Sequence, residues 1–155
     1  MISWNSRLFD EKTAETPENR YDGVHGGDKW MEWISEYFMG KCPDCYSLLQ
    51  WISLQGARPI TNVDVEQLSI QNQLQLTVDP VVIAGHMWSF LRSNLTGSAL
   101  TAFRRAPVRN GFEAWRCVTQ HVGKYSYERQ DELRQALKNP PTFKNYASMP
   151  MSISA

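Results

Sequence analysis

The residues best suited to chemistry are three cysteines and one histidine. Cys42 and Cys45 form a Cys-Pro-Asp-Cys motif, and Cys117 and His121 lie four residues apart further along the chain. A Cys-x-x-Cys pair at the start of a helix can have a lowered thiol pKa and can exchange disulfides. It can also supply half of a zinc site. Because Cys117 and His121 would share one helix face, a Cys₃His site is one hypothesis and disulfide exchange is another.

The sequence around these cysteines favours a structural role instead. A redox Cys-x-x-Cys motif typically follows a strand and begins a helix. Here the apolar residues on both sides of the motif are spaced as in helices. The two halves of the hypothetical zinc site are far apart in the sequence, and structural zinc sites usually take their ligand pairs from nearby segments. Cys45 also shares an apolar stripe with Leu48, Leu49 and Ile52, where cysteine packs as a small hydrophobic residue. We therefore expect structural thiols, no metal and no cofactor.

The histidines and one glycine-rich loop are the other candidates for catalysis. His25 lies in the loop 23–27, His86 lies inside an expected helix, and His121 lies near the end of another. No serine or cysteine stands with a histidine and an acid in a convincing set for nucleophilic catalysis. The loop lacks the preceding strand and the Gly-Lys-Ser/Thr ending of a phosphate-binding loop. We expect no enzymatic activity and no small-molecule substrate.

One basic cluster is a candidate binding surface. It consists of Arg104, Arg105 and Arg109, with Arg116 nearby. Such a cluster can contact RNA phosphates or line a pore in an assembled ring. The favoured alternative is a solvated loop whose arginines pair with acids of a neighbouring subunit. These four arginines are therefore candidate RNA or inter-subunit contacts.

Composition narrows the class of protein. The 155 residues carry 16 basic and 16 acidic side chains, so the formal net charge of zero gives no overall attraction to nucleic acid or an anionic membrane. No apolar run is long enough to span a bilayer, and the N-terminus lacks the basic and apolar regions of a secretory signal. Three cysteines are an odd number. We expect a reduced, cytoplasmic protein that makes no membrane contact.

The spacing of apolar residues predicts helices throughout. After Asp28, a possible N-cap, one stripe at helical spacing contains Trp30, Trp33, Ile34, Tyr37 and Phe38. By the same reasoning, helices are expected at about 28–40, 43–56, 61–78, 79–96, 99–106, 110–122 and 127–138, with a break at Gly123. The run 68–78 also alternates as a strand would, but an isolated strand has no partner, so helix is favoured.

These elements predict an all-α fold, a single compact bundle of about six or seven helices. Residues 1–26 are rich in turn formers and read as an N-terminal arm with local order at best, although Trp4, Leu8 and Phe9 could dock on the body. The helical domain spans 27–141, and 142–155 reads as a flexible tail or linker. Five tryptophans are expected to be mostly core, with one or two exposed at an interface: Trp30, Trp33, Trp51, Trp88 and Trp115.

Five segments, taken in order, resemble the capsid-type region of retrotransposon Gag polyproteins. They are LFDEK (8–12), YDGVHGGDKW (21–30), CPDCYSLLQW (42–51), HMWSFLRSNLTGSALTAF (86–103) and NGFEAWRCV (110–118). The family carries a similar succession: a Tyr/Phe-Asp-Gly turn, a Gly-Gly-x-x-Trp helix start, a Leu-Leu-x-Trp helix, a Trp-x-x-Leu segment and an Ala-Trp-Arg helix. The resemblance covers roughly residues 8–141.

The resemblance implies a structural protein with a retroviral-capsid-like fold, matching the N-terminal lobe. It implies self-assembly through helix faces into homo-oligomers or virus-like shells that enclose RNA. The sequence lacks the Cys/His zinc knuckle that often follows the capsid region, and it lacks the Gln-Gly-x-x-Glu motif that opens the second lobe of retroviral capsids. The alternative is a domesticated, monomeric helical adaptor that binds a peptide or RNA.

Overall fold

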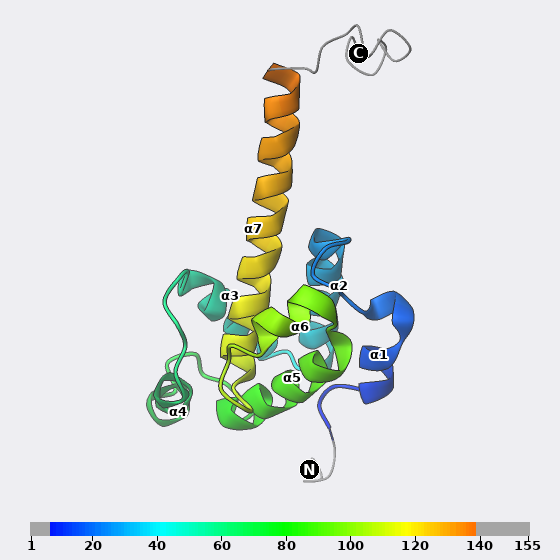
Figure 1. Ribbon diagram of the computed structural model, residues 1–155. Coiled ribbons are helices and arrows are strands. Elements are labelled where there is room, and N and C mark those ends of the chain that lie inside the picture. The colour runs from blue at the N-terminus through cyan, green and yellow to red at the C-terminus, as the bar shows by residue number, and fades with distance from the viewer. Residues whose placement is uncertain (1–6, 139–155) are drawn as a thin grey trace, which may run out of the picture. The chain divides into compact units, whose positions relative to one another are not determined.

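The computed structural model describes residues 7–138, except for the side chains of 125–133 and 138. Within that part of the chain every regular element is helical, which confirms the predicted all-α class (Figure 1). The elements are α1 (Glu11–Glu15), η1, a 3₁₀ turn (Pro17–Asn19), α2 (Gly27–Lys41), α3 (Cys45–Leu54), α4 (Asn62–Gln71), α5 (Pro80–Asn94), α6 (Gly97–Phe103) and α7 (Gly111–Lys138). The expected tail at 142–155 lies outside the described residues.

Helix α2 forms along the predicted stripe, but its N-cap lies two residues earlier than predicted. Trp30, Ile34 and Phe38 are buried on one face. The N-cap is Gly26 rather than Asp28, and Gly26 has a left-handed backbone with φ 67°. Glycine adopts this conformation without steric cost, so the chain can reverse tightly and enter the helix there. The acidic side chain of Asp28 then lies in the first turn, where it favours the helix dipole.

Helix α4 begins as predicted and ends earlier. Thr61 and Asp64 form the predicted reciprocal capping box. The helix stops after Gln71 because Asn72 adopts a left-handed conformation with φ 50°, which asparagine tolerates better than most residues. Residues 72–78 are therefore turns, and both the favoured helix and the alternative strand are wrong there.

The turns at 72–78 still contribute to the core. Leu74, Leu76 and Val78 pack against it from the loop. The carboxylate of Asp44 accepts hydrogen bonds from the backbone N–H groups of Thr77 and Val78, at 2.9 and 2.7 Å. Asp44, at the start of α3, thus holds this loop. Every second side chain of the loop, at Leu74, Leu76 and Val78, packs inward, which explains the alternation of apolar and polar residues.

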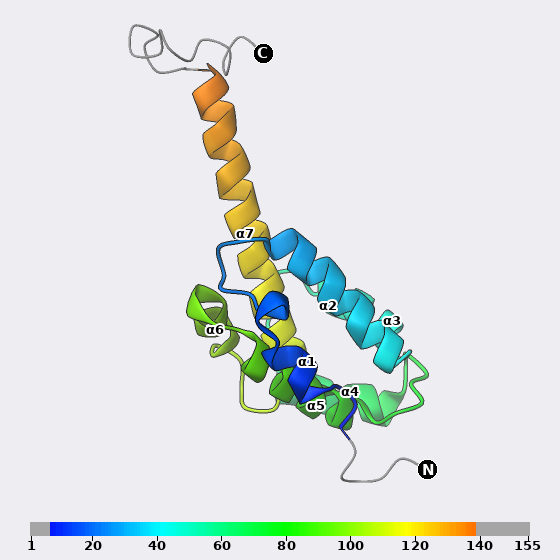
Figure 2. The ribbon, with the colours of Figure 1, turned by 90° about the vertical axis from the view of Figure 1, so that its right-hand side faces the viewer.

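Helix α5 is the central element of the first part of the chain. Asp79 caps it by accepting from the N–H of Val81, and Pro80 occupies its first turn, as the sequence predicted. Helices α1 and α4 both pack on α5, while α3 packs on α2 (Figure 2). Its buried residues include Ile83, Met87 and Leu91. The side chains of α5 therefore join the N-terminal segment to the middle of the chain.

The N-terminal segment is part of this body, which corrects the expectation of an arm with local order at best. Phe9, Ala14 and Tyr21 are buried. The reason is a buried asparagine on α5: Asn94 donates through Nδ2 to the carbonyl oxygens of Ala14 and Asn19, at 3.0 and 2.9 Å. Sequence periodicity could not reveal this docking, because the hydrogen bonds hold the backbone of two elements, α1 and η1, that are too short to show a periodic pattern.

Helix α7 runs without interruption through Gly123, so the predicted break and separate last helix are wrong. A glycine inside a helix costs only about 1 kcal/mol relative to alanine, which is too little to break a helix with good formers on both sides. The chain divides into two units, Met1–Val122 and Gly123–Ala155. The core and the surfaces described below belong to the first unit.

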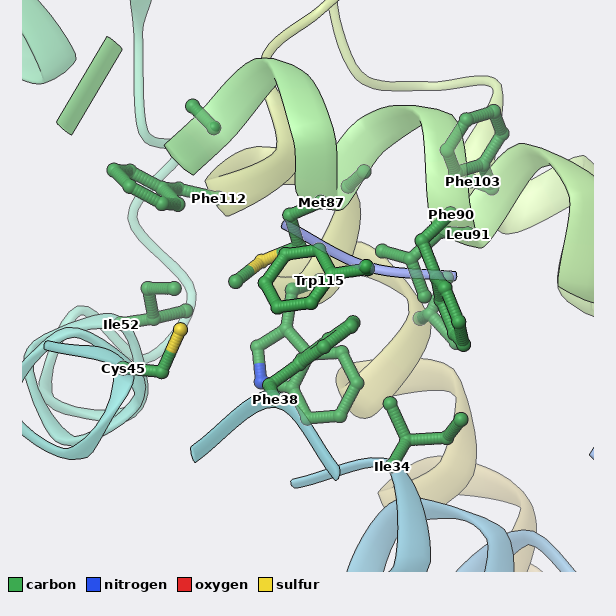
Figure 3. Close-up of a cluster of buried hydrophobic side chains, with 14 of the residues drawn as sticks. Ile34, Phe38, Cys45, Ile52, Met87, Phe90, Leu91, Phe103, Phe112 and Trp115 are labelled. Atoms are coloured by element: carbon green, nitrogen blue, oxygen red, sulfur yellow. The ribbon is translucent and has the colours of Figure 1, made fainter. Parts of the chain in front are cut away.

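An aromatic cluster fills that core (Figure 3). The Trp115 ring lies 5.7 Å from Trp30 and 5.6 Å from Phe38 between centroids. Trp30 and Trp115 are buried, and Trp51 and Trp88 are partly buried, as expected for core tryptophans. The fifth one differs, because 38% of Trp33 is exposed.

Candidate interaction surface

The structure separates the four candidate arginines. Arg104 and Arg105 are exposed in the loop after α6, whereas Arg116 is buried. The Arg116 guanidinium donates from Nε and Nη2 to the two carboxylate oxygens of Glu113, at 2.7 and 2.8 Å. Arg116 is thus occupied inside the protein, which corrects its assignment as a candidate RNA or inter-subunit contact. Arg109 is exposed too, but its side chain approaches Gly85 on α5.

The Glu113–Arg116 pair anchors the loop between α3 and α4 to the start of α7. Oε1 of Glu113 accepts a 2.7 Å hydrogen bond from the N–H of Ile60. Nη1 of Arg116 donates to the carbonyl oxygen of Gly56 at 3.2 Å. Asn110, which caps α7 by accepting from the N–H of Glu113, donates to the carbonyl oxygen of Ile60 at 2.9 Å. The loop backbone is therefore held at both Gly56 and Ile60.

Glu113 is charged at neutral pH despite its burial. Burial by itself raises the pKa of this carboxyl, but hydrogen bonds from Arg116, from the N–H of Ile60 and from the thiol of Cys117 outweigh it and lower the pKa below its usual 4.5. The pKa of Arg116 is raised, mainly because its guanidinium donates hydrogen bonds to Glu113. The pair is therefore a buried, fully hydrogen-bonded ion pair.

Two exposed valines lie on the segments that this network holds. Nδ2 of Asn110 also donates to Oδ1 of Asn62, at 3.0 Å, so the loop before α7 and the start of α4 are adjacent. Val63 follows Asn62 and is 61% exposed, and Val108 is 72% exposed in the loop before α7. Arg104 and Arg105 are exposed in the same loop as Val108. We call Val63, Arg104, Arg105 and Val108 together the junction surface.

Sequence reasoning found the two arginines of the junction surface and missed its valines and the network beneath it. Glu113 and Arg116 are three residues apart, a spacing at which oppositely charged side chains on a helix meet. That spacing was the available signal that Arg116 has an internal partner. No comparable signal marks Val63 or Val108, because an apolar residue in an irregular segment has no periodicity from which its exposure follows.

The three cysteines are buried thiols. No group of three or more His, Cys, Asp and Glu side chains is placed to hold a metal ion in the part of the chain that was searched, so Cys42, Cys45, Cys117 and His121 do not form the hypothetical four-ligand site. Burial and the neighbouring Glu113 carboxylate raise the pKa of Cys117 to about 11. A hydrogen bond with Cys42, and then burial, raise the pKa of Cys45, and the same hydrogen bond lowers the pKa of Cys42.

These environments predict an order of thiol reactivity. With a disulfide reagent at pH 8, the folded protein is expected to react at least about tenfold more slowly than the unfolded chain, because the thiolate is the nucleophile and all three sulfurs are buried. Cys42 should react first. Cys45 should react last, because it is completely buried and its pKa is raised more than that of Cys117. A Cys42→Ser variant should lose the fastest phase of the reaction. If that phase persisted in the variant, the assignment of the lowered pKa to Cys42 would be wrong.

One histidine does lie beside a serine, but the geometry opposes catalysis. Nε2 of His121 is 3.2 Å from Oγ of Ser98 and 2.9 Å from the carbonyl oxygen of Gly23. A carbonyl oxygen only accepts, so Nε2 must carry a proton and donate it to Gly23. A protonated Nε2 cannot take the proton of the Ser98 hydroxyl, so the pair does not form an activated nucleophile.

Comparisons with known proteins found no relative of this chain. Nothing matched the chain in a scan of protein-family models, in a search of curated proteins or in a search of solved structures. The resemblance to Gag capsid regions therefore stays a prediction from the sequence. Among the described residues, none of the helices combines the length and the apolar character needed to cross a membrane.

Proposed function

We propose that the chain is a structural protein of the Gag capsid type that self-associates through its junction surface. The observation that supports this proposal best is the pairing of exposed valines with exposed arginines on segments fixed by a buried network. Apolar side chains and arginine are both common at protein interfaces, and arginine is enriched among the residues that dominate binding energy. The resemblance extends the proposal to oligomers or shells that enclose RNA.

The rigidity of the junction surface favours association. Ordering a mobile loop on binding costs about 0.5–1.5 kcal/mol for each immobilised side chain of high rotamer entropy, beyond the cost for the backbone. Here Glu113 and Asn110 hold the backbone of Ile60, and Asn110 also holds the side chain of Asn62, which precedes Val63, before any partner arrives. A second copy therefore loses less free energy to ordering when it contacts Val63 and Val108.

The charge balance of the chain fits a second copy as the partner. Arg104 and Arg105 take part in no ion pair among the described residues. The chain carries as many acidic as basic side chains, so another copy can supply the carboxylates that these arginines need. RNA phosphates would meet the same need, and binding to them would weaken steeply as the salt concentration rises.

The first experiment is sedimentation of the full chain over a wide range of concentration. The wild type is expected to show oligomers that grow with concentration, and Val108→Asp is expected to shift the protein to monomer, since a carboxylate would replace an apolar contact. The matched control is Tyr46→Asp, because Tyr46 is 72% exposed on α3, outside the junction surface. A wild type that stayed strictly monomeric at high concentration and raised salt would count against self-association and favour the monomeric adaptor.

A second comparison separates a protein partner from RNA. Replacing Arg104 and Arg105 together by alanine should leave the melting temperature unchanged, because both side chains are exposed. The double variant is expected to weaken self-association in nuclease-treated protein. If it lowered only the ultraviolet absorbance of copurified RNA, the two arginines would be RNA contacts rather than inter-subunit contacts.

A further inference from the structure

A small cavity lies beside α5. Its volume is about 160 Å³. The segment before α1, helix α1, helix α5 and the loop before α7 all contribute to its wall, which is formed by Arg7, Phe9, Glu11, Gly85, His86, Ser89, Phe90 and Arg109. All of these residues belong to the first unit. The phenylalanines make one part of the wall apolar, and the remaining side chains make it mainly cationic and hydrogen-bonding.

We propose that this cavity binds a phosphate group. The groups that can donate to an anion come from three separate segments: Arg7 before α1, His86 and Ser89 on α5, and Arg109 before α7. A guanidinium pairs well with phosphate oxygens because its donors are planar and always charged. Donors that approach from several directions suit a tetrahedral anion better than a planar carboxylate, which offers only two oxygens.

Arg109 is held toward the cavity by its backbone and by a glycine. Its φ of 68° lies in the left-handed region, which non-glycine residues rarely adopt. The guanidinium lies directly against Gly85, and a Cβ atom at that position would be 2.5 Å from Nη2. Among the side chains that the structure describes, no carboxylate pairs with this guanidinium. Its charge and donors are therefore available to an anion in the cavity.

His86 is placed to respond to such an anion. Its Nδ1 accepts a hydrogen bond from the N–H of Leu8 at 3.4 Å, so the neutral ring carries its proton on Nε2 and remains a donor. Burial lowers the pKa of His86, and the positive charges of Arg109 and Arg7 lower it further. An anion that offset those charges would raise this pKa again, so binding and protonation of His86 favour each other.

The charges around His86 give the direction of the pH dependence. Arg7 and Arg109 face it as cations, and Glu11 lines the cavity as the one carboxylate. Glu11 already pairs with Arg7 at 2.7 Å. The cavity therefore has a net charge of one positive unit while His86 is neutral and two when it is protonated. A given ionisation state of phosphate should bind more tightly as the pH falls through the pKa of His86.

The test uses proton NMR of the histidine rings in the full chain, which has three histidines. Inorganic phosphate is added at constant ionic strength maintained with sodium chloride. The expected result is a saturable shift of the His86 signals and a rise in the His86 pKa, with His25 and His121 unchanged. Uridine 5′-monophosphate and glycerol 3-phosphate, tested in the same way, show whether the phosphate comes from an RNA end or a lipid headgroup. No saturable shift with any of the three would overturn the proposal.

Two variants and one control test whether the phosphate-dependent shift of the His86 signals arises from binding in the cavity. Arg109→Gln is expected to weaken phosphate binding about tenfold or more, as the loss of a charged hydrogen-bond donor implies. Gly85→Ala should weaken it as well, because the added methyl group displaces the Arg109 guanidinium while alanine remains favourable in the helix. The control is Arg92→Gln, which removes an exposed arginine of α5 that does not line the cavity and lies outside the junction surface. Equal phosphate affinity in Arg109→Gln and wild type would refute the site.

Discussion

Replacing Trp115 by alanine is expected to lower the free energy of unfolding by about 3–5 kcal/mol. Trp115 is buried at the start of α7, where its ring contacts Trp30 and Phe38. Removing it leaves a cavity between α2 and α7 and ends both aromatic contacts. A loss of this size is a large part of the stability of a typical domain, so much of the variant protein is expected to be unfolded or easily unfolded at physiological temperature.

The measurement is urea denaturation followed by circular dichroism, with Trp33→Ala as the control. Trp33 is a tryptophan of the same α2 cluster, but it is partly exposed and its main aromatic partner is Tyr37, at 5.6 Å. Its replacement is expected to cost about 1 kcal/mol. Trp115→Phe gives a milder test if the alanine variant does not fold. A Trp115→Ala protein whose melting temperature stayed within a few degrees of the wild type would show that Trp115 is not a core residue.

Breaking the buried ion pair of α7 should have a comparable effect. Arg116→Met is expected to cost about 3–5 kcal/mol, because it leaves the Glu113 carboxylate buried without its guanidinium partner. The loss also removes one of two hydrogen bonds to the carbonyl oxygen of Gly56, which keeps the one from Nε2 of Gln120 at 2.6 Å. The double variant Glu113→Gln/Arg116→Met should recover part of the stability, since no buried charge remains. A double variant as unstable as Arg116→Met would indicate that packing, rather than the unpaired charge, causes the loss.

The same pair gives stability a defined pH dependence. The folded-state pKa of Glu113 is below its usual value of 4.5, so the unfolded chain binds the proton more readily. The contribution of Glu113 is therefore fully present above about pH 4.5 and is lost as the pH falls through its lower folded-state pKa. Glu113→Gln should reduce the acid dependence of the unfolding free energy. The wild-type curve must be compared with the variant curve, because hydrogen bonds from the backbone and side chain of His25 also lower the pKa of Asp22, to about 2.

The regular helices could be predicted because their apolar residues follow the helical period. The stripe at Trp30, Ile34 and Phe38 and the caps at Thr61 and Asp79 are all local signals, and each is present in the structure. The features that the sequence predicted wrongly depend on small differences in free energy or on contacts between residues far apart in the sequence. Whether α7 breaks at a glycine is decided by about 1 kcal/mol.

The candidate site was only partly predictable for the same reason. Clustering in the sequence identified Arg104, Arg105, Arg109 and Arg116 as neighbours, but it could not show which side chains point inward. Glu113 occupies Arg116, and Gly85 admits the side chain of Arg109, through contacts that span three and 24 residues of sequence. The first contact was visible as a helical spacing. The second depends on the packing of two segments and leaves no local pattern.

The buried Asn94 has a consequence for how the chain is synthesised. Its hydrogen bonds join it to Ala14 and Asn19, which the ribosome makes about 80 and 75 residues earlier. The N-terminal segment is thus produced first but is buried only after α5 has left the exit tunnel. Until then Phe9 and Tyr21 stay exposed, and contacts of such long sequence separation slow folding. During translation, we expect the early segment to stay open to chaperone binding until α5 has emerged.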